Sequence, residues 1–235
     1  MAITAAMVKE LREMTGAGMM DCKKALTETN GDMDAAVDVL KKSGAAKMEK
    51  KQSRIAAEGI ARVAVNGNVA VVAEVNSETD FVAKNETFQE FVQTVADTAL
   101  ASDLNGGANG EDIEALLATN GLSDLLVEKT ATIGEKLSVR RFAKVTGDAV
   151  ASYIHGGGRI GVVIAADGAS DDAAKEALTN IAMQVAAMNP QYISRNDISA
   201  EELAKIKEIT IDSALNDATT LPKPCLLYTS PSPRD

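Results

Sequence analysis

Apolar side chains recur at helical spacing through the first 44 residues, in three groups that turn residues separate. Thr4 can cap a first helix and Gly16 can end it. Further on, Asn30 and Gly31 favour a turn, and Asp32 can cap a third helix. The pattern predicts a compact module of three short helices that ends near residue 44. Its apolar positions are Met7, Val8, Leu11 and Met14, then Cys22, Ala25 and Leu26, then Met33, Ala36, Val37 and Leu40.

A cluster of basic residues follows this module, although the chain as a whole is acidic, with a formal net charge of -10. Because charge runs usually lie in solvent, we expect a solvated linker here, so that module and linker form a domain over residues 1–54. The acidic balance argues against a nucleic-acid backbone as a direct partner, since binding phosphates needs a basic face. The clustered basic residues are Lys41, Lys42, Lys47, Lys50, Lys51 and Arg54.

From Ile60 the apolar positions alternate with a period of two, which is typical of strands. Asn66 and Gly67 form a strong hairpin signal between two such runs. A loop over residues 77–85 follows, and Thr87 with Glu90 makes a capping box for the next helix. The pattern predicts a hairpin with a helix packed on it. The strand positions are Val63, Val65, Val69, Val71, Ala73 and Val75, and the helix positions are Phe88, Phe91, Val92 and Val95.

The same pattern returns about ninety residues later without a gap, by direct comparison of positions. We interpret it as a duplicated hairpin-plus-helix unit in an α+β core, with one half over residues 55–141 and the other over 142–198. Helices over 112–117 and 124–133 and a strand with Leu137, Val139 and Arg141 are expected between the two units. The matched positions of the second unit are Gly157, Gly161 and Ala165 in the hairpin, and Leu178, Ile181, Ala182 and Val185 in the helix.

Asn189 and Pro190 close the second unit, after which Ser199 and Glu202 form a capping box for another helix over residues 199–224. The last eleven residues, 225–235, can be encoded by a stretch that reads as a transposase-based sequencing adapter. We therefore expect a non-native tail with no function. The alternative is a natural end rich in proline and serine that remains disordered.

Two cysteines, Cys22 and Cys225, cannot make a disulfide framework and suit a reducing cytosol. The N-terminus has no basic start before an apolar block, and the longest apolar runs are far too short to cross a bilayer. The sequence therefore predicts a cytoplasmic protein with no membrane contact.

No constellation of residues favours catalysis, a metal or a cofactor. His155 is the only histidine, and the glycines after it formally match a dinucleotide fingerprint, but residues 162–165 continue as a strand where that fingerprint needs a helix. A glycine-rich hairpin is the better interpretation. Glu74, Glu78 and Asp80 lie close in sequence, yet nothing marks them as a pocket, and the alternation places Glu74 opposite the apolar face of its strand, in solvent.

Two segments place large apolar side chains where the chain should turn. Residues 79–85 put Phe81 beside Asp80, and residues 11–26 put Met19 and Met20 between glycines at a helix junction. The two consecutive methionines cannot both face one small core from a helix. The alternatives are that Phe81 packs under its own helix, and that the methionines and Arg12 serve only packing and solvation within the module.

These two segments closely resemble bacterial elongation factor Ts, the guanine nucleotide exchange factor of elongation factor Tu, and the resemblance runs to about residue 224. It implies a ubiquitin-associated-like first module, a pseudo-symmetric core and only the first helix of a protruding helical hairpin. It also implies that Asp80 and Phe81 enter the partner's GTPase domain near its nucleotide and magnesium. Arg12, Met19 and Met20 would dock on a helix of that domain, the core would make a second contact, and full-length members could form homo-oligomers.

The leading hypothesis is therefore a non-enzymatic exchange factor that releases GDP from elongation factor Tu. One rival is an enzyme that uses the His155 glycine loop on a nucleotide or phosphate. The other is a simple helical adaptor in which only the residues up to Gly44 bind.

Overall fold

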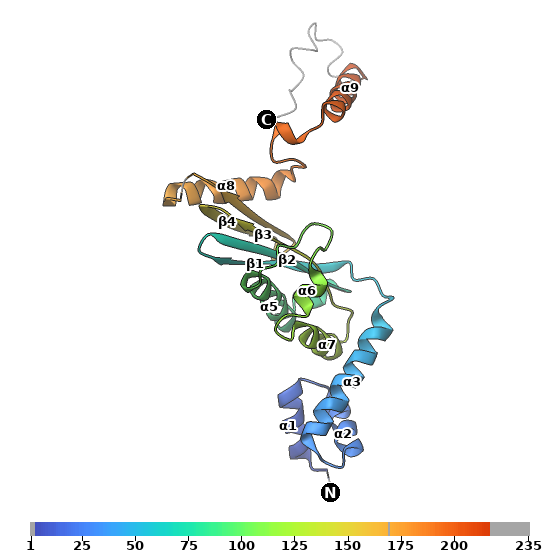
Figure 1. Ribbon diagram of the computed structural model, residues 1–235. Helices are drawn as coiled ribbons and strands as arrows, with labels where there is room; N and C mark the ends of the chain where they lie inside the picture. Colours follow the sequence, from blue (N-terminus) through green and yellow to red (C-terminus); the bar gives the residue numbers. More distant parts are fainter. Residues whose placement is uncertain (1–2, 169, 217–235) are drawn as a thin grey trace. The chain divides into compact units, whose positions relative to one another are not determined.

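The computed structural model describes residues 3–168 and 170–216 (Figure 1). The chain divides into two units between Ala187 and Met188. The tail over residues 225–235 and the end of the preceding segment lie outside the described residues. No helix in the described part of the chain is both long enough and apolar enough to span a bilayer.

The first three helices form the predicted module: α1 (Ala5–Thr15), α2 (Met19–Glu28) and α3 (Met33–Lys51). The hydroxyl of Thr4 accepts a hydrogen bond from the backbone N–H of Met7, and the Asp32 carboxylate accepts one from Ala35, as the capping signals predicted. Met14 departs from the prediction, because its side chain is 61% exposed. The buried core of the module is Val8, Leu11, Cys22, Ala25, Leu26 and Ala36.

Helix α3 continues for two turns beyond the predicted end, so the segment is helical and not a linker, although most of its basic side chains are exposed as expected. Lysine and alanine are good helix formers, and the segment also gains contacts with α7 (Leu122–Ile133). A Cβ placed on Gly44 would lie 3.2 Å from Cγ1 of Val127, so the missing side chain lets the two helices approach closely. Further along α3, the Lys51 ammonium donates to the carbonyl of Thr130 at 3.3 Å. The module is therefore packed on the core.

Three antiparallel strands form the first sheet: β1 (Glu58–Asn66), β2 (Val69–Ser77) and β3 (Ser138–Thr146), with β2 in the centre. The predicted boundary at residues 141 and 142 falls inside β3. Helix α5 (Glu86–Ala101) covers one face and buries all four of its predicted apolar positions, as Figure 1 shows. Its cap is Asn85, whose side chain accepts from the N–H of Phe88, so the predicted Thr87 capping box is wrong. The small helix α6 (Ile113–Leu117) precedes α7, close to the expected positions.

The second hairpin, β4 (Ala149–His155) and β5 (Ile160–Ala166), makes a two-stranded sheet and is followed by α8 (Asp172–Met188). The hairpin lies on the face of the first sheet opposite α5 (Figure 1). A Cβ on Gly161 would lie 2.9 Å from side-chain atoms of both Ala61 and Val72, so this contact requires glycine. Leu178 and Ala182 of α8 are buried, whereas Ile181 is half exposed. A mixed α+β fold is confirmed.

The second unit contains α9 (Ala200–Asn216), preceded by the 3-10 turn Arg195–Asp197. The hydroxyl of Ser199 accepts from the N–H of Glu202 at 3.2 Å, as the capping box predicted. The Glu202 carboxylate accepts from the hydroxyl of Tyr192 instead of closing the box. None of the α9 side chains is buried.

Candidate functional site

Phe81 lies in the short helix α4 (Asp80–Ala83), where a plain loop was expected. The turn forms because the hydroxyl of Thr79 caps it, accepting from the N–H of Val82 at 3.4 Å. The Phe81 side chain is 80% exposed, so the alternative that it packs under its own helix is wrong. A large aromatic ring in solvent at a fixed turn is a surface available to a partner.

The neighbouring Asp80 carboxylate is held in its charged form. Lys84, one helical turn further on, donates to it at 2.7 Å. This hydrogen bond and the lysine charge hold the pKa of Asp80 below its usual value. Asp80 and Phe81 therefore place an ionised carboxylate, paired with Lys84, beside an exposed apolar ring.

Two carboxylates join the α4 turn to the loop between α7 and β3. The backbone N–H and the hydroxyl of Thr79 donate to the two oxygens of Glu135, at 3.0 and 2.7 Å. The carboxylate of Glu78 accepts in return from the backbone N–H of Lys136. Sequence reasoning missed Glu135 altogether and gave Glu78 no structural partner, because each interaction joins residues more than fifty positions apart.

The module presents a second exposed apolar surface at the start of α2. Met19 and Met20 are 57% and 76% exposed, and Arg12 on α1 is also exposed. Cys22, one turn along α2, is buried instead, and burial raises the pKa of its thiol. Both methionines are thus outside the module core, and the alternative that they serve its packing is wrong.

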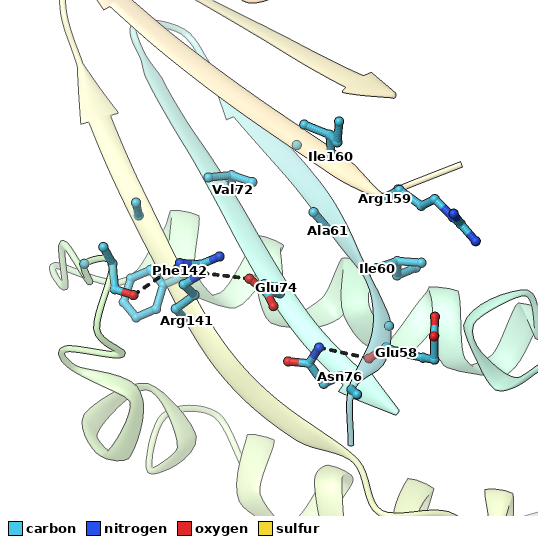
Figure 2. A pocket seen from close by; sticks show the side chains of 17 residues that line it. Glu58, Ile60, Ala61, Val72, Glu74, Asn76, Arg141, Phe142, Arg159 and Ile160 are labelled. Atoms are coloured by element: carbon cyan, nitrogen blue, oxygen red, sulfur yellow. Dashed lines mark hydrogen bonds and ion pairs between the residues drawn. The ribbon is translucent and has the colours of Figure 1, made fainter. Parts of the chain in front are cut away.

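A cavity of about 700 Å³ lies between the first sheet and the turn of the second hairpin (Figure 2). Glu74 lines it, which corrects the expectation that nothing marks this carboxylate as part of a pocket. Its oxygen accepts from Nε of Arg141 at 2.7 Å, while the side-chain amide of Asn76 donates to the carbonyl of Glu58 at 2.9 Å. The charged groups of β2 and β3 in this cavity are therefore already paired with each other.

The glycine loop after His155 is a hairpin turn, as predicted. It connects β4 to β5, and the carbonyl of Gly158 accepts from the N–H of Ala61 at 2.7 Å. The phenol of Tyr153 and Nδ1 of His155 lie 3.0 Å apart. Because a strand follows the loop, its N–H groups are not the start of a helix that could hold a phosphate. In the part of the chain that the structure describes, no group of His, Cys, Asp or Glu side chains could hold a metal ion.

A comparison with protein families matches residues 78–225 to the family model described as Elongation factor TS. This range covers more than half of the chain and begins at the residue before the Thr79 cap. The chain belongs to the elongation factor Ts family. Asp80, Phe81 and Glu135 lie within the matched range, whereas Arg12 and the two methionines precede it.

The Glu78 contact predicts a pH-dependent stability. The N–H of Lys136, and then the guanidinium of Arg54, lower the pKa of Glu78, and Lys51 acts in the same direction. A carboxylate whose pKa is lower in the folded state than in the unfolded state stabilises the fold. This contribution to the free energy of unfolding is complete above the unfolded-state pKa and is lost as the pH falls through the folded-state pKa. Denaturant titrations should therefore show that Glu78→Gln flattens the fall in the free energy of unfolding between about pH 5 and 3.

Glu128→Gln is the matched control, because among the described residues that α7 carboxylate is paired with its neighbour Lys129, at 3.4 Å, and not with the α7–β3 loop. An unchanged pH slope in Glu78→Gln would show that the contact with Lys136 does not stabilise the fold.

Proposed function

We propose that this chain is a guanine nucleotide exchange factor that binds elongation factor Tu and promotes release of its GDP during translation elongation. It acts without a catalytic residue, metal or cofactor of its own, in the cytoplasm. The observation that carries the proposal is the exposed Phe81 ring beside the charged Asp80, on a turn that lies within the matched family range.

The physical basis is linkage between two ligands of one partner. An exchange factor that prefers the nucleotide-free GTPase weakens GDP binding by the same factor by which GDP weakens the binding of the exchange factor. Accelerating release about ten-thousandfold requires lowering the barrier by roughly 5.5 kcal/mol. Burying one aromatic ring supplies about 1.5 to 3 kcal/mol, so further contacts must act with Phe81.

We assign these further contacts to the N-terminal module and the core. In this proposal, Met19 and Met20 dock with Arg12 on the GTPase domain, because methionine adapts to irregular apolar surfaces. The module is then ubiquitin-associated-like, and the two hairpin-plus-helix units form a duplicated core that makes a second contact. The acidic chain binds no nucleic acid directly, and full-length members could form homo-oligomers.

Stopped-flow fluorescence tests the proposal directly. Elongation factor Tu loaded with a fluorescent GDP analogue is mixed with excess unlabelled GDP, with and without the chain. Release should be much faster in its presence, and an unchanged rate would contradict the proposal. Equilibrium dialysis with GDP alone addresses the rival enzyme, since binding of GDP without elongation factor Tu would favour a nucleotide site in the chain itself.

A further inference from the structure

We propose that Glu135 is a positioning residue for exchange, which fixes the Phe81 turn through Thr79 without touching the partner. This inference rests on the proposed function. It concerns the α4 turn, whose single helical turn is too short to be stable by its own hydrogen bonds. Something outside the turn must hold it, and the contacts of Glu135 supply that support.

The geometry of the contact is specific. Both oxygens of Glu135 are used, one by the backbone N–H of Thr79 at 3.0 Å and the other by its hydroxyl at 2.7 Å. The N–H belongs to the residue that caps α4, so the carboxylate fixes the backbone from which the helix starts. A carboxylate near a helix N-terminus also interacts favourably with its dipole. Hydrogen bonds to an ionised acceptor are about twice as strong as neutral ones.

The contact is reciprocal and extends to the end of α3. Glu78 accepts from the N–H of Lys136, so two adjacent residues on each side are tied together. The ammonium of Lys136 donates to the carbonyls of Gln52 and Arg54 at 2.7 and 2.9 Å. Arg54 in turn donates to Glu78 at 3.3 Å. The Phe81 turn is therefore anchored to the α7–β3 loop and to the segment after α3.

The direct test is Glu135→Gln in the full chain. Glutamine keeps the length of the side chain, but its single oxygen is uncharged and its amide nitrogen cannot accept. The Thr79 N–H then loses its ionised acceptor, and the hydroxyl can stay in contact with the amide only by accepting from it. Hydrogen exchange should show at least a tenfold loss of protection at the Thr79 amide, with Val71 and Val75 of β2 unchanged. With elongation factor Tu and a fluorescent GDP analogue, the maximal release rate should fall at least fivefold. The half-saturating concentration should change less than twofold.

Glu128→Gln, on α7 and away from Thr79, should leave both measurements unchanged. A second pair of variants keeps the test valid if the glutamine variant misfolds. Thr79→Ser should keep the hydroxyl and the normal rate. Thr79→Val loses the hydroxyl bond to Glu135 and the cap of α4, while its N–H remains, and it should lower the rate. Unchanged Thr79 protection in Glu135→Gln would overturn the anchoring role. Lost protection with an unchanged maximal rate would overturn the role in exchange. If the unmutated chain released no GDP, the proposed function would fail, while the protection data would still report on the anchor.

Discussion

Phe81→Ala should lower the maximal rate of stimulated GDP release about 10- to 100-fold, with a much smaller effect on overall association. The ring is worth about 1.5 to 3 kcal/mol when buried, and each 1.4 kcal/mol in the barrier changes the rate tenfold. Other contacts hold the complex, so titration of the factor should give nearly the same half-saturating concentration. The free protein should keep its stability, because the ring is exposed and packs against little.

Ile55→Ala is a matched control for this experiment. Its side chain is 82% exposed, as much as that of Phe81, but it lies outside the α4 turn. Removing it should leave the release rate unchanged. Equal losses in Phe81→Ala and Ile55→Ala would show that general apolar surface, rather than the ring at the turn, drives release. A stopped-flow trace for Phe81→Ala that matches the unmutated chain would refute the proposed role of the ring in GDP release.

Replacing Met19 and Met20 together by alanine should weaken binding to elongation factor Tu about tenfold or more, measured by isothermal titration calorimetry. Both side chains are exposed in the free protein, so their contact area is available only to a partner. Alanine has the highest helix propensity, so α2 should remain helical by circular dichroism. The maximal release rate at saturation should change less than the affinity.

Met14→Ala is the control, since this methionine of α1 is exposed to a similar extent but has no proposed role. It should bind normally. If the double alanine variant unfolded the module, the methionines would belong to the core and the interface assignment would be wrong. The adaptor alternative, in which only this module binds, has its own test. If a chain without the module still released GDP at the full rate, that alternative would be wrong.

Sequence patterns predicted the features that depend only on residues close together in the chain. Thr4, Asp32 and Ser199 cap helices as expected, because a cap bonds to a backbone group only two or three residues away. The hairpin formed close to the predicted place. Asn66 is the last residue of β1 and pairs with Val69, so the tight turn is made by Gly67, which has a positive φ, and Asn68. The exposure of Phe81 was not settled by its position at the end of a strand, since that position also allows the ring to pack under its own helix.

The remaining features depend on contacts between distant residues. The extension of α3 follows partly from helix propensity and partly from the close approach of Gly44 to α7, about eighty residues away, and no local pattern records that contact. The contact between Glu135 and Thr79 is invisible for the same reason. At the start of α5, Asn85 and Thr87 are both acceptable caps, and only the surrounding structure selects Asn85. Glu74 was expected in solvent because the alternation shows which face it is on but not that the second hairpin packs there.

The close packing of α3 on α7 has a consequence for the kinetics of complex formation. The Lys47 ammonium lies 2.8 Å from the Asp21 carboxylate, and the Lys51 contact continues the connection from the module to α7. Met20 and Phe81 are therefore held on one rigid support. Once either side chain has bound the partner, the other is already close to its own binding site, at a high effective concentration. The second contact then needs little further loss of conformational entropy. A flexible insertion in α3 would slow formation of the productive complex while leaving both contact surfaces chemically intact.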